Sequence, residues 1–235
     1  MSCGAVYFDL GNTLAMGLSE SVRRILGARL NLSEKEVKRV GRVVMTTPAL
    51  SPDALADALD PILPSHSLQE IRQTVRSLWR EQEESVRVLP GAAELLEQFK
   101  QRGFRVGVIS NTWHPFMLGL RRSCGRMVDP IDDWLLSYQV GEKKPAKGLF
   151  ARALAASALK PSQCWMVGDS YELDVAPALE VGMKAVWLLV RPERERETLA
   201  RILRGEVPPP TWAAVELAEL RRLFLNEQGV GSLSD

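Results

Sequence analysis

The sequence is short of the features that mark several large classes of protein. Its 235 residues carry 30 Lys and Arg against 29 Asp and Glu, which gives a net charge of +1. Proteins that bind the phosphates of nucleic acids usually carry a clear basic excess, so we expect no nucleic-acid partner. A hydrophobic content of 46% with no dominant charge sign also disfavours a disordered chain.

Long apolar runs and cysteines are scarce as well. No run of about 20 apolar residues is present, so we expect no membrane helix. The N-terminal residues MSCGAVYFDL carry no basic stretch before a short apolar run, which is not the pattern of a signal peptide. Cys3, Cys124 and Cys164 are odd in number and far apart, which fits a reducing compartment without disulfides. We therefore expect a cytoplasmic protein that acts on a small molecule.

Short apolar runs rich in β-branched and aromatic residues recur along the chain. Apolar residues at consecutive positions predict strands that are buried on both faces, as in parallel sheets. These runs cover residues 5–10, 104–109, 163–167 and 184–190, and helical patterns cover 91–102, 145–158 and 173–181. The alternation of strands and helices predicts an α/β fold with a doubly wound parallel sheet.

One long stretch does not follow this alternation. Residues 15–88 show no convincing strand, and they carry three helix-start signals, at Ser33, Ser51 and Ser67. We therefore predict an all-helical insert, a cap domain, over residues 15–88. The α/β core would then consist of residues 1–14 and 89–235. Towards the end of the core we expect a charged helix over 192–203, and a short strand or turn with a last helix over 212–225.

Polar residues follow three of the predicted strands at the points where the strands end. These clusters are residues 9–13, 110–112 and 168–170, with Asp174 five positions after Asp169. Ligands of open parallel sheets bind outside the carboxyl ends of the strands, so we expect the clusters to meet at one edge. Lys144 precedes a predicted helix and could reach the same place. Such carboxylates suit Mg²⁺, and a carboxylate can also act as a nucleophile that forms an aspartyl-phosphate.

Four motifs in this order resemble those of the haloacid dehalogenase (HAD) superfamily. They are FDLGNTL at 8–14, ISNT at 109–112, Lys144-Pro145, and VGDS at 167–170 followed by Asp174. The position of the helical insert, between the first and second motifs, resembles that of a C1-type cap. The resemblance covers the chain apart from the insert, with the C-terminal tail left open. It implies a Mg²⁺-dependent hydrolase that acts on a small phosphorylated substrate.

The resemblance also implies roles for particular residues. Asp9 would be the nucleophile and a metal ligand, and Lys144 would steady both Asp9 and the phosphoryl charge. Ser110 would bind the phosphate, with Asn111 beside it. The remaining protein ligands of Mg²⁺ would be Asp169 and the backbone carbonyl of Gly11, and Asp174 would support either the metal or the lysine.

Position 11 departs from the pattern of the family's phosphatases, which carry a second Asp there as general acid and base. Glycine has no side chain for that proton transfer, which is typically worth about 10²–10⁴-fold in rate. One interpretation is a hydrolase that is slow on ordinary phosphate esters or that takes a substrate with a good leaving group. A second is a dehalogenase, whose relatives lack the Gly-Asp-Ser metal motif, or a carbon–phosphorus hydrolase, which would need a cap lysine such as Lys35 or Lys38. A third is a binding or interaction protein without catalysis.

Some residues near these motifs have simpler interpretations. Trp113 and Phe116 are expected to pack beneath the cap, and His114 is expected at the surface more than in the site. The charges of residues 191–197 alternate in sign, which is typical of a solvated helix face. The sequence gives no indication of the oligomeric state.

Overall fold

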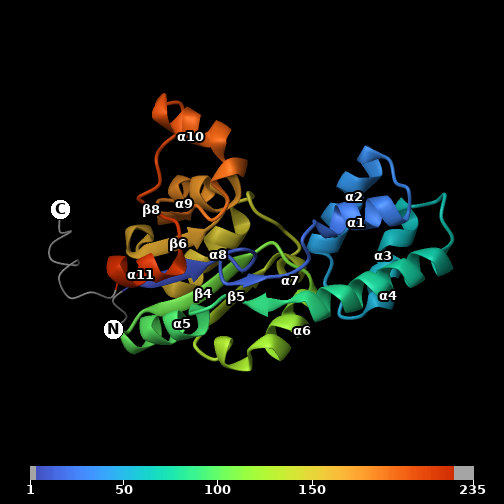
Figure 1. Ribbon diagram of the computed structural model, residues 1–235, viewed down its shortest axis with the longest axis horizontal. Coiled ribbons are helices and arrows are strands. Elements are labelled where there is room, and N and C mark those ends of the chain that lie inside the picture. Colours follow the sequence, from blue (N-terminus) through green and yellow to red (C-terminus); the bar gives the residue numbers. More distant parts are fainter. Residues whose placement is uncertain (1–3, 225–235) are drawn as a thin grey trace.

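A six-stranded parallel sheet lies at the centre of the fold, as the alternation of strands and helices predicts. The computed structural model describes residues 4–224, so Cys3 and the ends of the predicted core lie outside the described residues. All neighbouring strands of the sheet run parallel. Their order is β5 (Asp133–Leu136), β4 (Arg105–Ser110), β1 (Ala5–Phe8), β6 (Cys164–Gly168), β7 (Lys184–Leu188) and β8 (Trp212–Ala214). β1 therefore lies in the interior of the sheet, where its C-terminal end has a strand on either side (Figure 1).

Helices cover both faces of this sheet. Successive residues of β1 point to opposite faces, so they pack into two different hydrophobic cores. Val6 and Phe8 belong to a core that also contains Phe99 of α5 (Ala92–Gln101) and Phe224 of α11 (Leu217–Phe224). Ala5 and Tyr7 belong to a second core with residues of α8 (Gly148–Ser157) and α9 (Ala176–Glu180). Figure 1 shows α5 and α11 on one side of the sheet and α8 and α9 on the other.

Four helices occupy the stretch in which the sequence predicts only helices. They are α1 (Val22–Arg29), α2 (Glu34–Thr46), α3 (Pro52–Leu59) and α4 (Leu68–Ser85), with a short 3-10 turn at Asp60–Ile62. The expected caps are present. Ser33 and Glu36 form a reciprocal capping box, and the hydroxyls of Ser51 and Ser67 each accept a backbone N–H of the first turn. α4 packs against α6 (His114–Ser123), which belongs to the sheet-bearing part of the chain.

The ends of this helical stretch differ from the prediction, because each forms a two-residue strand. β2 (Ala15–Met16) pairs antiparallel with β3 (Arg87–Val88), and the N–H of Leu89 donates to the carbonyl of Leu14. The expectation of no strand over residues 15–88 is therefore wrong at both ends, because two residues are too few to show a period in the sequence. The division into core and cap stays a prediction. Both connections between the two predicted parts run through the two-stranded ribbon of β2 and β3.

Several smaller elements were not anticipated in their final form. β5 and α6 were not predicted, the helix expected over 145–158 begins at Gly148, and the one expected over 173–181 divides into a π-helical turn, η4 (Tyr171–Val175), and α9. The expected charged helix is a 3-10 turn at Pro192–Arg194 followed by α10 (Arg196–Leu203). The other short elements are α7 (Ser137–Val140) and 3-10 turns at Gly125–Met127 and Pro161–Gln163. Among the described residues, no helix has both the length and the apolar character needed to cross a membrane.

The contact between Gly107 and Tyr7 gives a test of the sheet. A Cβ added to Gly107 would lie 2.3 Å from Cε1 of Tyr7, whose hydroxyl is held by the carbonyl of Ala153 at 2.8 Å. Gly107→Ala should therefore lower the free energy of unfolding by about 1–3 kcal/mol, measured by urea denaturation. Gly125→Ala is the matched control, because an added Cβ there meets no atom within 4 Å. Equal stability of the two variants would contradict this packing.

Candidate active site

Asp9 lies at the C-terminal end of β1, in the middle of the sheet edge where ligands of parallel sheets bind. Its backbone N–H donates to the carbonyl of Val167 at 2.9 Å, which extends the pairing of β1 and β6 by one residue. The side chain of Asp9 is 11% exposed. The backbone of Asp9 is therefore held by β6, while its carboxylate remains partly exposed at the edge of the sheet.

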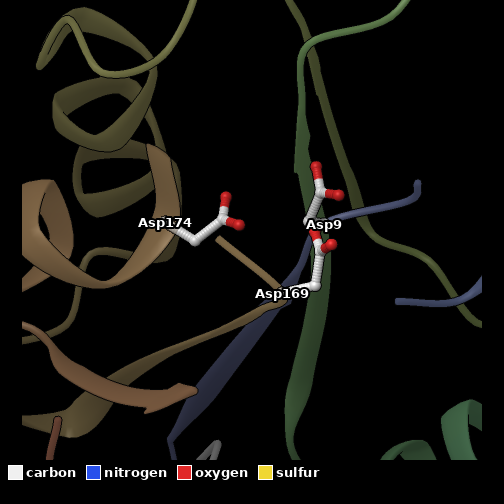
Figure 2. A group of neighbouring side chains, drawn as sticks. All are labelled: Asp9, Asp169 and Asp174. Carbon is white, nitrogen blue, oxygen red and sulfur yellow. The ribbon is translucent and has the colours of Figure 1, made fainter. Parts of the chain in front are cut away.

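Two further aspartates meet Asp9 at this edge. Asp169 follows β6 directly and Asp174 lies in η4, and one carboxylate oxygen from each of the three residues lies within 4.8 Å of the others. Figure 2 shows Asp9 and Asp169 side by side at the ends of neighbouring strands, with the carboxylate of Asp174 facing them from the helical turn. The convergence expected from the sequence for these three side chains is therefore present.

The ammonium group of Lys144 joins two of these carboxylates. Its Nζ donates to Oδ1 of Asp9 at 2.6 Å, to Oδ1 of Asp174 at 2.5 Å and to the carbonyl of Ile109 at 2.9 Å. Its side chain is only 2% exposed. Burial alone would lower the pKa of Lys144, but the charges of Asp174 and Asp9 outweigh burial and raise it, so the group stays charged.

Asp174 is fixed on both of its oxygens. Oδ1 accepts from Lys144, and Oδ2 accepts the backbone N–H of Ser170 at 3.1 Å. Burial raises the pKa of Asp174, and Lys144 opposes that rise. A Cβ on Gly168 would lie 2.4 Å from the carboxyl carbon of Asp174, so glycine at position 168 is what lets this side chain lie against β6.

Ser110 and Asn111 lie where β4 ends, as the sequence predicts. Ser110 is buried and faces the cavity described below. The amide of Asn111 holds the backbone of Lys144 twice, because Nδ2 donates to the Lys144 carbonyl at 3.0 Å and Oδ1 accepts the Lys144 N–H at 2.7 Å. Asn111 therefore positions Lys144, a role that was not predicted from the sequence.

Gly11 lies in the tight loop that follows Asp9. The N–H groups of Leu14 and Ala15 both donate to the carbonyl of Leu10, and Asn12 has a left-handed backbone with φ of 58°. A Cβ on Gly11 would meet only Oδ2 of Asp9 within 4 Å, at 3.9 Å, which is an ordinary contact. The loop therefore has room for a side chain at position 11.

Arg191 joins the site although the sequence predicts that it belongs to a solvated helix face. It follows β7 at the same edge of the sheet, and its Nη2 donates to Oδ2 of Asp169. Burial and the nearby carboxylate of Asp9 raise the pKa of Asp169, and Arg191 opposes that rise. The expectation for Arg191 is wrong because Arg191 precedes the 3-10 turn at Pro192–Arg194 and does not lie on a helix. Its position shortly after a strand of the parallel sheet was the available signal.

A cavity of about 240 Å³ lies between this edge and the helical stretch. Gly11, Ser110 and Asn111 line one side of it. Val22 of α1, Met45 of α2 and Gln82 of α4 line the opposite side. Both the sheet edge and the helices therefore contribute walls to one space beside the loop that follows Asp9, although Asp9, Lys144 and Asp169 do not line it themselves.

Aromatic side chains connect α4 to the loop after β4. Nε1 of Trp113 donates to the buried Oε1 of Gln82 at 2.9 Å, and the rings of Trp79 and Trp113 meet edge to face at 5.6 Å. Trp113 and Phe116 pack against the helical part as expected, and both also line the cavity. His114 is half-buried, hydrogen-bonds to the Tyr138 hydroxyl at 3.2 Å and faces a separate cavity of about 180 Å³.

Comparison with known proteins gives matches to one family. A family model described as haloacid dehalogenase-like hydrolase matches residues 3–182. A ribulose-1,5-bisphosphate 5-phosphatase from Halopiger xanaduensis is 32% identical over 108 residues, which cover 46% of this chain and 45% of that protein. A glyceraldehyde 3-phosphate phosphatase from Methanothermobacter thermautotrophicus is 25% identical over 77% of this chain and 84% of that protein. The chain spans about half the length of several curated relatives that it matches.

Solved structures share the fold at lower sequence identity. YfnB from Bacillus subtilis, described as a HAD-hydrolase and solved with magnesium bound, is 18% identical to this chain and has a TM-score of 0.60. The similarity covers 95% of this chain and 99% of YfnB. Because the helical stretch falls within this coverage, the similarity extends over both parts of the fold.

The buried ion cluster gives a test of the site's electrostatics. Lys144→Met should lower the free energy of unfolding by about 3–5 kcal/mol, because it leaves two buried carboxylates without their cation. Lys147→Met is the matched control. Lys147 pairs with Glu180 at 3.0 Å, and both side chains are more than half exposed, so its loss should cost less than about 1 kcal/mol. Urea denaturation at fixed pH measures both variants.

The pH dependence of the same variant checks the cause. Without Lys144 the pKa of Asp174 rises further above its unfolded value, so folding takes up a proton over a wider pH range. The pKa of Asp174 is already about 7 when Lys144 is present, so the additional proton uptake of the variant falls above pH 7. The deficit of Lys144→Met relative to wild type should therefore shrink as the pH falls from about 9 to about 7. A deficit that grows at low pH would contradict the charge cluster.

Proposed function

The chain belongs to the haloacid dehalogenase-like hydrolase family, and from that premise we propose that it is a phosphatase acting on a small phosphorylated molecule. The observation that carries the proposal is the buried triad of Asp9, Lys144 and Asp174, together with Asp169 beside it. A carboxylate held by a buried ammonium at the open edge of a sheet is equipped to attack phosphorus. The phosphatases among the curated relatives support the same class of substrate.

The aspartate cluster fits a divalent cation, and we propose Mg²⁺. Mg²⁺ takes hard oxygen ligands and is usually held by one or two carboxylates, waters and substrate phosphate. Asp9 and Asp169 are the carboxylates we assign to it, with the backbone carbonyl of Gly11. Both oxygens of Asp174 are already hydrogen-bonded, so we assign Asp174 to the support of Lys144. The ion would supply positive charge to the phosphoryl oxygens.

The reaction we propose uses the side chains as they lie. A carboxylate oxygen of Asp9 attacks phosphorus, a P–O bond forms to Asp9, and the bond to the leaving oxygen breaks. Lys144 balances the charge that gathers on the phosphoryl group, and the Ser110 hydroxyl binds one of its oxygens. Asn111 keeps Lys144 in place through the Lys144 backbone. Water then attacks the aspartyl-phosphate and releases orthophosphate and free Asp9.

We further propose that residues 15–88 act as a cap over this reaction. The cavity that begins at Leu10 and Gly11, directly after Asp9, is walled partly by residues of this stretch, so a leaving group that extends into it would meet Val22, Met45 and Gln82. Such a cap shields the reaction from water and selects the leaving group by shape. The apolar side chains in the wall favour a leaving group with apolar surface.

Gly11 determines for which leaving groups the bond to phosphorus breaks rapidly at this site. No side chain at position 11 can donate a proton, so the leaving oxygen must depart as an anion, which is fast only when its conjugate acid is strongly acidic. We therefore propose that the physiological substrate has a good leaving group, or that turnover is slow. A protein that binds phosphorylated molecules without turnover is the alternative, and the next experiment separates the two.

Turnover of 4-nitrophenyl phosphate with Mg²⁺ tests the nucleophile. The wild type should release nitrophenol, and Asp9→Asn should lower kcat by roughly 10³-fold or more because the amide cannot attack phosphorus. Asp129→Asn, at an exposed position, is the control and should match the wild type. No turnover by wild type or by Gly11→Asp, despite bound Mg²⁺ and orthophosphate, would favour the binding protein.

The acidity of the leaving group tests the role of position 11. Values of kcat/KM for 2,4-dinitrophenyl, 4-nitrophenyl and phenyl phosphate should fall steeply in the wild type as the leaving group becomes more basic. Gly11→Asp has room for its Cβ at a position that lines the cavity, and it should restore proton donation, which raises kcat/KM for phenyl phosphate by about 10²-fold. The dinitrophenyl ester should gain little. A wild-type series that does not depend on the leaving group would contradict the proposal.

A further inference from the structure

Arg191 is the second cation at the carboxylate cluster, and no motif of the sequence accounts for it. Its guanidinium bonds Asp169, whose side chain is 6% exposed, and it enters the edge of the sheet from the segment after β7. Asp169 is also held through its backbone, because Nε1 of Trp187 donates to its carbonyl at 3.2 Å. Arg191 therefore contacts a carboxylate that is fixed in position.

The charges of the cluster show what this contact does. Three carboxylates, Asp9, Asp169 and Asp174, face two cations, Lys144 and Arg191. Counting each as ionised, the cluster carries a net charge of −1 with Arg191 and −2 without it. A divalent cation is drawn to the cluster by this charge, so the presence of Arg191 weakens the attraction.

The two cations differ in their freedom to move. Lys144 is buried and bound to three oxygen atoms, so it cannot leave without stranding Asp9 and Asp174. Arg191 has a side chain 34% exposed, and its buried Nε has no hydrogen-bond partner among the described residues. Arg191 is therefore the cation that can yield Asp169 to an incoming ion.

A second carboxylate lies within the electrostatic reach of Arg191. Burial and the charges of Asp169 and Glu172 raise the pKa of Glu195, and Arg191 opposes that rise. The charge of Arg191 therefore acts on Glu195 as well as on Asp169. Moving away from Asp169 towards Glu195 would keep the guanidinium beside a negative charge.

We propose that Arg191 is a positioning residue that competes with a divalent cation for Asp169 and so lowers the affinity of the site for that cation. The inference rests on the metal site of the proposed function, but it concerns binding and does not require turnover. In this arrangement the cation binds only when it displaces Arg191 from Asp169, or shares the carboxylate with it against the repulsion of a neighbouring positive charge.

Titration calorimetry with MgCl₂ in the absence of substrate tests the proposal. Arg191→Gln removes the charge and should lower the Kd for Mg²⁺ by about tenfold relative to the wild type. Arg191→Lys retains the charge and should bind Mg²⁺ with nearly the wild-type Kd. Arg201→Gln is the matched control, because Arg201 lies 3.9 Å from the half-exposed Glu206, and it should also match the wild type. Asp169→Asn should abolish the binding heat in both backgrounds.

Other outcomes would overturn the proposal. An unchanged or higher Kd for Mg²⁺ in Arg191→Gln would mean that Arg191 does not compete with the cation. A selective loss of orthophosphate binding at saturating Mg²⁺, with Mg²⁺ binding unaltered, would assign Arg191 to the phosphoryl group. Absence of Mg²⁺ binding in both wild type and Arg191→Gln would also overturn it. Failure of the phosphatase proposal has a separate signature, since turnover insensitive to Asp9→Asn leaves these Mg²⁺ affinities unaffected.

Discussion

The buried charge of Lys144 is the constraint on which the rest of the site depends. An ammonium group without water must have several oxygen partners, or the folded state would lose the solvation energy of that charge. The three partners of Lys144 come from the ends of β1 and β4 and from the turn η4 after β6. These segments are far apart in the chain, so the cluster requires that β1, β4 and β6 lie together in the sheet. The placement of Asp9 therefore depends on the pairing of these three strands.

The strands that consist of uninterrupted apolar residues could be predicted from the sequence, and a strand that mixes charged and apolar residues could not. β1, β4, β6 and β7 are continuous apolar runs and were found within about two residues. β5 begins Asp133-Trp134 at the border of the sheet, and Asp133 is held there by Arg105 at 2.6 Å. The sequence does not show that Asp133 has an ion-pair partner in the fold, so a charged residue at this position does not indicate a strand.

The site follows the same division. The aspartates and Lys144 could be predicted because each lies in a motif at a strand or helix boundary. The hydrogen bonds of Asn111 to the Lys144 backbone and the contact of Arg191 with Asp169 could not, because each depends on how one side chain is oriented in a folded loop, which no sequence pattern specifies. Gly11 adds no carboxylate to the cluster, and Arg191 adds a positive charge to it.

The ribbon of β2 and β3 has a consequence for how the chain can vary. The helical stretch leaves the sheet at Ala15 and returns at Val88, and these two residues are paired partners. Because the two ends of the helical stretch are already paired, a change in the length or shape of the stretch need not displace the strands of the main sheet. Helices between these ends can be exchanged, extended or trimmed while β1 and β4 keep their register. Under the proposed function, the residues that carry out the reaction and the residues that select the substrate can therefore evolve separately, the first in the sheet and the second in the helices.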